Sequence, residues 1–464
     1  MPLDLLTIAR DIIAVDSRSS VSDRALVDVL IPLCRTVGLS TSLLREARDG
    51  VPQFDLLAQR SGGSDRPPLL LNTHLDTVPP GDPALWTACA GDPFALTERD
   101  GHLHGLGVAD VKLDFVCKLL ALERLRAEPL ERTVLLAGTY GEETGRYGAK
   151  LLARRRRPLP AMALVGEPSR LRPSTAHKGY VELRLSATAD PRSTTPAAPS
   201  WRLTFEGVAA HSSQTHRGRS ANDAALDALG ALSSRPGFRL LSLNGGDLVN
   251  RVATRAVAVV ALDRRPALES GGVEALGSAT APAAPPKLVD LLLAARASTR
   301  LLEAELRRFP TEGFDPPWST VNNGLVRLEE GRLSHVCDVR RLSGEGPSRA
   351  LDQHIARLEA ALAAWGGEAS LERALDSAPF AAPRGSAVVT ALESVLAEHG
   401  LPAEPELKSG TTEASVYAGA GLDTVVFGPG PASGNIHRPN ERVPLADLEA
   451  AVAIYADVIR RLCA

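Results

Sequence analysis

Histidines and carboxylates that could bind divalent metal ions follow apolar segments at five points of the sequence. These segments read "LLLNTHLD", "HGLGVADVK", "LLAGTYGEETG", "ALVGEPS" and "VVFGPGPASGNIHRPNE". The groups they carry are His74, Asp76, Asp110, Glu142, Glu143, Glu167 and His437. Imidazole nitrogen combined with carboxylate oxygen suits zinc, cobalt or manganese. The set is larger than one tetrahedral zinc needs, so it predicts a site for two metal ions.

The spacing of the first pair indicates a shared site. Residues 69–73 have the apolar character of a buried strand, and side chains two apart in a strand point to the same face. His74 and Asp76 are therefore expected to point together beyond the strand end, where open α/β sheets bind ligands. A single aspartate at a helix start, such as Asp110, is usually a helix cap. The joint occurrence at five strand ends is what favours a functional site.

The elements that must hold these groups alternate between helix and strand, which predicts an α/β/α domain with a mixed sheet. In the first part of the chain, helices are predicted at 4–15, 22–37 and 111–128, and strands at 54–59, 68–73, 133–139 and 162–168. The same texture returns after about residue 378, with predicted helices at 385–400 and 445–462 and a strand within 422–431.

Between these two parts the sequence changes character. Residues 180–189 and 200–207 alternate with the period of strands, and residues 220–232 have the pattern of a helix. Two low-complexity stretches, 190–200 and 277–286, are predicted to be flexible loops.

A weak internal similarity within this region links residues 240–265 and 318–342. It indicates a duplicated half-unit. The predicted organisation is an α/β catalytic domain made of residues 1–177 and 378–464, interrupted by an α+β domain at 178–377.

Bulk composition narrows the possible partners. The 464 residues, with 44% hydrophobic and 23% charged, predict a globular protein of two or more domains. A net charge of −3 gives no reason to expect nucleic acid or a membrane as partner. The five cysteines form no C-x-x-C pair, and the N-terminus lacks a signal-peptide pattern. A cytoplasmic location is therefore expected.

The motifs "HLDTVP", "GLGVADVK", "GEETG", "GEPS" and "GNIHRPNE" resemble, in the same order, those of a family of co-catalytic zinc hydrolases. This family includes acetylornithine deacetylase, succinyl-diaminopimelate desuccinylase, glutamate carboxypeptidase and aminoacyl-histidine dipeptidase. The resemblance implies a zinc-peptidase-like catalytic domain with an inserted ferredoxin-like lid domain. It also implies two divalent ions as cofactors, with zinc the first expectation and cobalt or manganese as alternatives.

The resemblance assigns a role to each residue of the motifs. His74 and Glu167 would bind the first metal, Glu143 and His437 the second, and Asp110 would bridge the two. Asp76 would orient His74, as expected around zinc. Glu142 would be the general base. The sequence departs from the family at Leu113, where a glycine usually follows the lysine, although no ligand is lost.

Further candidates lie in and near the lid. "GVAAHSSQTHRGRSAND" resembles the motif whose histidine contacts the tetrahedral intermediate, which implies this role for His211. His216 has no counterpart in the motif. Asn250 and Arg340 match lid residues that relatives use to bind substrate, and arginine suits a substrate carboxylate. Glu413, in "SGTTEAS", is a candidate for contact with a substrate ammonium group.

The substrate stays open at this stage. The α/β part is most similar to the acetylornithine deacetylase branch, which favours hydrolysis of a small N-acyl amino acid with a free carboxylate. The enlarged lid resembles that of the aminoacyl-histidine dipeptidases, so a dipeptidase or carboxypeptidase is the alternative.

The sequence disfavours two hypotheses without catalysis and leaves the oligomeric state open. A relative that binds metals or peptides without turnover would lack a ligand or the base, and none is missing. A purely structural scaffold would make the five clusters a coincidence. If the lid is duplicated, one chain supplies both of its halves, so both a homodimer and an active monomer are compatible with the sequence.

Overall fold

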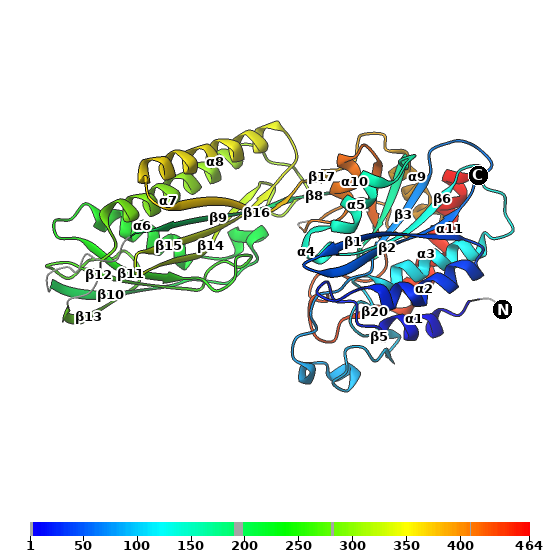
Figure 1. The fold of residues 1–464 in the computed structure, drawn as a ribbon, viewed down its shortest axis with the longest axis horizontal. Coiled ribbons are helices and arrows are strands. Elements are labelled where there is room, and N and C mark those ends of the chain that lie inside the picture. Colours follow the sequence, from blue (N-terminus) through cyan, green and yellow to red (C-terminus); the bar gives the residue numbers. More distant parts are fainter. Residues whose placement is uncertain (1–2, 190–197, 280–282, 409) are drawn as a thin grey trace. The chain divides into compact units, whose positions relative to one another are not determined.

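The computed structural model describes residues 3–189, 198–279, 283–408 and 410–464. Its chain forms two compact units. Unit 1 contains Met1–His177, Phe380–Leu407 and Thr412–Ala464, and unit 2 contains Lys178–Pro379 and Lys408–Thr411. Unit 2 is thus inserted into the sequence of unit 1, so the blue and red ends of the chain belong to the same unit in Figure 1.

Unit 1 is built on a mixed sheet with the strand order β1-β2-β6-β3-β7-β19-β8-β17, and β18 pairs with β8. The strands are β1 (Ser40–Arg48), β2 (Val51–Arg60), β3 (Leu69–His74), β6 (Val134–Thr139), β7 (Met162–Gly166), β8 (Ser174–His177), β17 (Phe380–Ala381), β18 (Glu406–Lys408) and β19 (Asp423–Phe427). The central strands β6, β3, β7 and β19 run parallel to their neighbours in this group. They are almost entirely buried, as expected of parallel strands covered on both faces. The predicted mixed sheet is confirmed.

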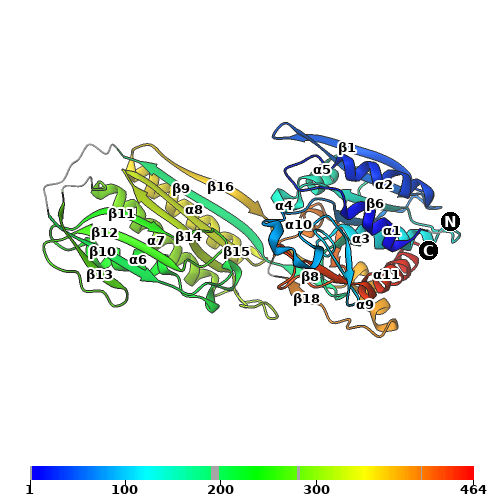
Figure 2. The ribbon, with the colours of Figure 1, turned by 90° about the horizontal axis from the view of Figure 1, so that it is seen from below.

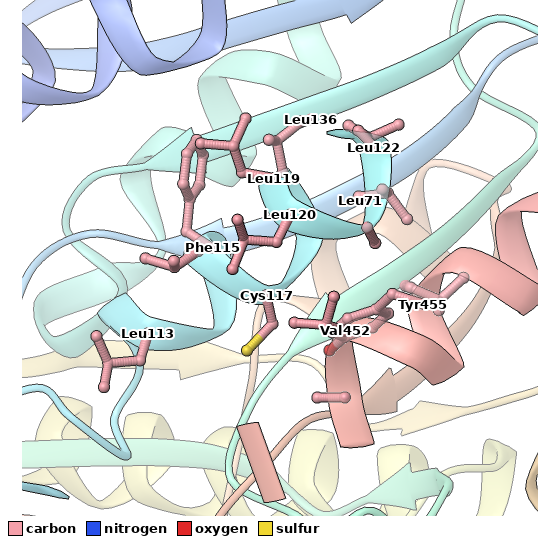
Figure 3. Close-up of a cluster of buried hydrophobic side chains, with 14 of the residues drawn as sticks. Leu71, Leu113, Phe115, Cys117, Leu119, Leu120, Leu122, Leu136, Val452 and Tyr455 are labelled. Atoms are coloured by element: carbon pink, nitrogen blue, oxygen red, sulfur yellow. The ribbon is translucent and has the colours of Figure 1, made fainter. Parts of the chain in front are cut away.

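Helices cover both faces of this sheet. The helices of unit 1 are α1 (Leu5–Ile13), α2 (Arg24–Thr36), α3 (Lys112–Arg124), α4 (Glu142–Gly145), α5 (Tyr147–Arg155), α9 (Ala387–Glu398), α10 (Ala414–Gly419) and α11 (Leu445–Cys463). On one face, Leu71 and Leu136 of the sheet pack with residues of α3 and α11 in the larger core (Figure 3). On the other face, Leu70 and Leu135 pack with residues of α5 and α10. Leucines adjacent in the sequence therefore serve opposite layers, which is the two-residue period of a strand.

α3 begins directly after the Asp110 loop and is buried over its first three turns. It carries a buried ion pair, with Lys118 Nζ 2.6 Å from Asp114 Oδ2. The same carboxylate oxygen accepts a 2.5 Å hydrogen bond from the Thr73 hydroxyl. This network ties α3 to the end of β3, next to His74. A helix that is buried all round and pairs Lys118 with Asp114 suits a position between other layers.

A small three-stranded sheet brings distant loops of unit 1 together. Its strands are β4 (Thr97–Arg99), β5 (His102–His104) and β20 (Arg442–Pro444), with β5 in the middle. β4 and β5 form a hairpin that carries His102 and His104. Because β20 follows the His437 loop and β5 precedes the Asp110 loop, the pairing of β20 with β5 sets these two loops side by side.

Unit 2 contains an antiparallel sheet with the order β13-β10-β12-β11-β14-β15-β9-β16. The strands are β9 (Gly179–Thr188), β10 (Ala198–Glu206), β11 (Arg239–Gly245), β12 (Arg255–Ala261), β13 (Gly272–Ala279), β14 (Thr320–Glu329), β15 (Arg332–Arg341) and β16 (Ala369–Ser377). Three helices among the described residues pack on this sheet around one apolar core (Figure 2). They are α6 (Ala221–Ser233), α7 (Pro286–Leu306) and α8 (Glu345–Trp365).

The strand order of unit 2 contains the same arrangement twice. β9, β14, β15 and β16 lie in the order β16-β9-β15-β14, and β10, β11, β12 and β13 lie in the order β13-β10-β12-β11. In each set the first strand of the chain lies between the fourth and the third, and the second strand follows the third. The two second strands, β11 and β14, pair with each other at the centre of the sheet. The similar segments 240–265 and 318–342 contain the equivalent hairpins β11–β12 and β14–β15.

Helix boundaries follow local capping chemistry. α6 begins after Ser220, whose hydroxyl accepts a hydrogen bond from Asp223 N (3.1 Å). α9 begins after Ser386, whose hydroxyl accepts from Val389 N (3.1 Å). α8 ends at Gly366, which has a φ of 71°, the left-handed conformation that glycine adopts readily at a helix end.

The predicted flexible loops at 190–200 and 277–286 are partly wrong. Residues 190–197 and 280–282 lie outside the described residues, whereas residues 198–200 belong to β10 and residues 277–279 to β13. Ala198 pairs with Ala279 where β10 and β13 meet, and Pro286 begins α7. Ladder hydrogen bonds involve only the backbone, so small-residue composition does not prevent a segment from completing a strand.

Along the described ranges, every helix is too short or too polar to cross a lipid bilayer.

Candidate active site

The parallel strands of unit 1 bring several of the predicted metal ligands together at the carboxyl ends of the strands. β3, β6 and β7 are parallel and adjacent, so the residues that follow them emerge together. His74 is the last residue of β3. Glu142 and Glu143 begin α4 after β6, and Glu167 follows β7 directly.

Asp110 lies between the two predicted histidine ligands. Its Oδ1 is 3.3 Å from Nε2 of His74, and its Oδ2 is 3.1 Å from Nε2 of His437. The same His437 nitrogen is 3.2 Å from Oε2 of Glu143. Because each oxygen of one carboxylate faces a different imidazole, Asp110 has the geometry of a bridge between two neighbouring ligand sets.

The donor set fits a divalent cation. The ligand atoms of His74, Asp110 and Glu143 all lie within 4.8 Å of one another, so they can reach a common ion. His74 and Asp110 are buried, so the charge of the Asp110 carboxylate is poorly solvated by water. A bound cation would neutralise this charge. Nitrogen and carboxylate oxygen without thiolate suits zinc, cobalt or manganese.

Asp76 makes contacts beyond those predicted from the sequence. Nδ1 of His74 lies 3.0 Å from the backbone oxygen of Asp76 and 3.5 Å from its carboxylate. Donation from Nδ1 to this oxygen leaves Nε2 free to bind metal. The carboxylate accepts from the backbone N–H groups of Glu142 (3.0 Å) and Glu143 (3.2 Å) and from the Ser19 hydroxyl (2.6 Å). Asp76 therefore couples the end of β3 to the first turn of α4.

Burial and mutual charge shift the pKa values of the cluster. Hydrogen bonding to Asp110 and Glu143 raises the pKa of His437 to about 11, against the effect of burial. For Asp110 the stabilisation by His437 and His74 outweighs burial, and its pKa is lowered. Burial and the charge of Asp110 raise the pKa of Glu143 to about 7. Burial opposes protonation of His74, yet its contacts with Asp110 and Asp76 raise its pKa.

Glu142 differs from its neighbour Glu143 in its surroundings. Burial, together with the charges of Glu167 and Glu143, raises the pKa of Glu142 well above the usual range, although His74 acts in the opposite direction. Its Oε1 has no hydrogen-bond partner among the described residues, and Nη1 of Arg146 is 4.0 Å away. A buried carboxylate beside the ligand set but outside its contacts is placed to exchange a proton.

Unit 2 brings three of the predicted lid residues into one neighbourhood. Nδ1 of His211 accepts from the backbone N–H of Ser213 (3.1 Å), so the neutral ring carries its proton on Nε2. Ser212, the residue after His211, donates its N–H to the backbone oxygen of Asn250 (3.0 Å). Much of His211 is exposed, but burial of its inner side and the charge of Arg340 lower its pKa to about 4.

Arg340 already has a carboxylate partner within unit 2. Its Nε and Nη2 donate to the two oxygens of Asp338 at 2.9 and 3.1 Å, and its guanidinium lies 3.9 Å from the centre of the Tyr180 ring. Nη1 and the second N–H of Nη2 are outside this bidentate pair, so these would be the donors to a substrate carboxylate.

The remaining candidates take other positions. Glu413 is 1% exposed, and its Oε2 accepts a hydrogen bond from the Thr139 hydroxyl (2.9 Å). Burial raises its pKa to about 7, and His74 is close enough to oppose the rise. Glu413 is thus placed behind the ligand cluster instead of facing solvent. His216 pairs with Asp315 at 3.0 Å.

Sequence reasoning missed Glu441, although it lies in the quoted motif "GNIHRPNE". Its buried carboxylate accepts hydrogen bonds from backbone N–H groups of the Asp110 loop. The available signal was an acidic residue four positions after His437, a spacing that is uninformative unless the partner loop is known.

Comparison with known proteins shows the family to which the chain belongs. Residues 70–461 match the profile of Peptidase family M20/M25/M40, which is most of the chain. The chain belongs to this family. The acetylornithine deacetylase of Klebsiella pneumoniae (strain 342) is 29% identical over 344 residues, covering 70% of this chain and 80% of that protein. The acetylornithine deacetylase of Proteus mirabilis (strain HI4320) is 30% identical over 272 residues, covering 54% of this chain and 63% of that protein.

One solved structure is similar in fold to nearly the whole of this chain. The aminoacylhistidine dipeptidase of Vibrio alginolyticus superposes with a TM-score of 0.72 at 15% identity, covering 98% of this chain and 96% of that structure. At this identity the match establishes the fold. The family match and the homologues confirm the predicted family and show that the chain is a metal-dependent amidohydrolase. The fold match agrees with the family's architecture of a catalytic domain and a lid domain.

Proposed function

We propose that this M20 protein hydrolyses the amide bond of a small N-acyl amino acid, using two divalent metal ions. The observation that carries the proposal is the position of Asp110 between His74 and His437. Glu167 would complete the set at His74, and Glu143 the set at His437. Zinc is proposed as the metal, and the same donors accept cobalt or manganese.

When bound, the ions would polarise the amide carbonyl and lower the pKa of water at the site. Glu142 is proposed as the general base that takes the proton of the attacking water and passes it to the leaving amine. Two features support this role: its carboxylate is buried, and Asp76 holds its backbone N–H in place. Glu143, one residue later, contacts His437 and is proposed as a ligand instead.

The lid residues have proposed roles in substrate binding and in stabilising the transition state. A neutral His211 with its proton on Nε2 is a suitable donor for a developing oxyanion. Asn250 and Arg340 are proposed to bind the substrate. The buried position of Glu413 supports a role behind the metal ligands rather than contact with a substrate ammonium group.

Two observations favour different substrates. Sequence similarity to acetylornithine deacetylases supports an N-acyl amino acid, with N-acetyl-ornithine as the first compound to test. The fold of the whole chain, including the lid, superposes on an aminoacylhistidine dipeptidase, and this makes a dipeptide the second candidate.

The repeated strand order of unit 2 supports a further proposal on assembly. Both halves of the lid come from one chain, so catalysis would not require a second copy. A monomer in analytical ultracentrifugation with full specific activity is the expected result. Activity that disappears on dilution would show instead that two copies must associate.

The decisive experiment measures amide hydrolysis by the purified protein loaded with zinc or cobalt. The panel contains N-acetyl-ornithine, other N-acyl amino acids and dipeptides, including Xaa-His peptides. A chelated sample and Glu142→Ala are the controls. Cleavage of N-acyl substrates alone supports the proposal. Cleavage of dipeptides with a free α-amine supports the dipeptidase alternative, and no cleavage with two metals bound contradicts both.

A further inference from the structure

Glu441 connects the two loops that carry the proposed metal ligands Asp110 and His437. Its Oε1 accepts hydrogen bonds from the backbone N–H groups of Ala109 (2.8 Å) and Asp110 (3.0 Å), and its Oε2 accepts from Gly107 (3.3 Å). Its backbone oxygen accepts from the N–H of Gly105 (3.2 Å). One residue of the His437 loop therefore makes four hydrogen bonds with the Asp110 loop.

The Asp110 loop needs such an acceptor. Buried backbone N–H groups must be paired, and residues 107–110 are buried but lie outside any helix or strand. Gly107 has a φ of 84°, and a Cβ there would lie 3.0 Å from a methyl group of Thr77. A side chain can therefore hardly be accommodated at this turn, and the loop is held by its backbone.

The partners of Glu441 are unusual for a buried acid. The carboxylate is 1% exposed, and among the described residues no lysine, arginine or histidine forms an ion pair with it. Its hydrogen bonds go to backbone N–H groups, the buried Lys112 attracts it without forming an ion pair, and the like charge of Asp110 lies beside it. A divalent ion bound by Asp110 would add positive charge close to this carboxylate. Carboxylates next to metal ligands are commonly stabilised in this way.

The neighbouring residue provides a comparison. Asn440 also ties the His437 loop to another part of unit 1, but to a different one. Its Nδ2 donates to the backbone oxygen of Leu85 (3.1 Å), and its Oδ1 accepts from the N–H of Ala88 (2.8 Å). Asn440 therefore anchors the loop without touching Asp110.

We propose that Glu441 is a positioning residue that sets the affinity of the two-metal site by holding the backbone of Asp110 against the His437 loop. This inference rests on the proposed metal site. Glu441 itself is not a ligand. It acts through Asp110, whose two carboxylate oxygens must face both imidazoles at once, so a small rotation of this loop separates the ligand sets.

The test measures metal dissociation constants by competition with a chromogenic chelator for the full-length protein and its variants. Glu441→Gln keeps the size of the side chain but places an amide N–H against the N–H of Gly107. Its affinity for zinc and cobalt is expected to fall by about 10- to 100-fold. The visible absorption of the cobalt-loaded variant should also change, because that spectrum reports ligand geometry.

Two variants serve as controls. Glu398→Gln makes the same chemical change at an exposed residue paired with Arg461, and Asn440→Ala loosens the His437 loop elsewhere. Both should bind metal like the wild type. Unchanged affinity in Glu441→Gln, or an equal loss in Asn440→Ala, would overturn the inference. A wild-type protein that binds no metal would instead contradict the proposed function.

Discussion

Buried charges are arranged differently in the two units of this protein. In unit 2 they are neutralised within the unit: Asp338 pairs with Arg340, and Arg296 pairs with Asp223 and Asp227. Unit 1 also contains such a pair, Lys118 with Asp114, but its cluster at the strand ends is different. There Asp110 and Glu143 face imidazoles, and Nη1 of Arg146 is 4.0 Å from Oε1 of Glu142. Buried ions paired with each other serve the fold, whereas a buried group of carboxylates around histidines marks a functional site.

The two units also place their polar residues differently. Unit 1 concentrates its candidate residues at the ends of parallel strands, where the sheet geometry brings them together. In unit 2, His211 lies in the loop before α6, Asn250 lies between β11 and β12, and Arg340 lies near the end of β15. Neighbouring strands of an antiparallel sheet run in opposite directions, so their carboxyl ends do not meet at one place. These three residues come together through loop contacts instead.

The largest expected effect tests the role of the glutamate pair in unit 1. Glu142→Ala should lower kcat by about 10²- to 10⁴-fold, since a general base contributes that much. It should retain both metals, because Glu142 lies outside the ligand contacts. Glu143→Ala is the matched comparison and should lose metal. Metal content and kcat are measured together, and loss of metal from Glu142→Ala would mean that the two glutamates have exchanged roles.

A large effect on stability is expected in unit 2 from Asp338→Asn. This change leaves the buried charge of Arg340 without its carboxylate and should destabilise unit 2 by about 3–5 kcal/mol. Urea unfolding followed by tryptophan fluorescence in a Trp86→Phe background isolates unit 2, because Trp201, Trp318 and Trp365 all lie there. Metal content should not change. A destabilisation below about 1 kcal/mol would show that the pair is not worth more than a surface ion pair.

A smaller effect on catalysis is expected from the lid histidine. His211→Ala should lower kcat by about 100-fold or more, as for loss of one oxyanion donor, with both metals retained. His216→Ala, five residues further along the same segment, should have kcat close to that of the wild type. Equal kcat values for the two variants would remove His211 from the proposed mechanism.

The smallest expected effect of a single substitution concerns the acid sensitivity of unit 2. Burial lowers the pKa of His335 to about 4 and that of His354 to about 3, with the charge of Arg296 adding to the first and that of His335 to the second. Their contacts are with the neutral Asn323 and Ser298. The unfolded chain takes up these protons near pH 6.5, so stability is full above that pH and declines as the pH falls toward about 4.

Between pH 7.5 and 5, each of these histidines should cost about 2 kcal/mol of unfolding free energy. Urea unfolding in the Trp86→Phe background at the two pH values measures the loss. His335→Gln, which can still donate to Asn323, should reduce the loss by about half. A loss that is unaffected by this substitution would assign the acid sensitivity to other groups.

The sequence by itself determined the parts of this protein that depend on short segments. Continuous apolar runs predicted the central strands of unit 1, and helical patterns predicted the helices around them. His74 ends one of these strands and Glu167 directly follows another, so candidate metal ligands could be proposed without knowledge of the fold. The family was predicted from the order of five local motifs, and the match of residues 70–461 confirms it.

Only the tertiary structure decided how distant segments complete one another. Asp76 reaches the backbone of Glu142, 66 residues away, and Glu441 reaches Asp110 across 331 residues. The ends of β10 and β13 were predicted to be loops, yet pair as strands. The physical reason is common to all three: backbone N–H and C=O groups are the same at every position, so sequence patterns do not show which distant partner will satisfy them.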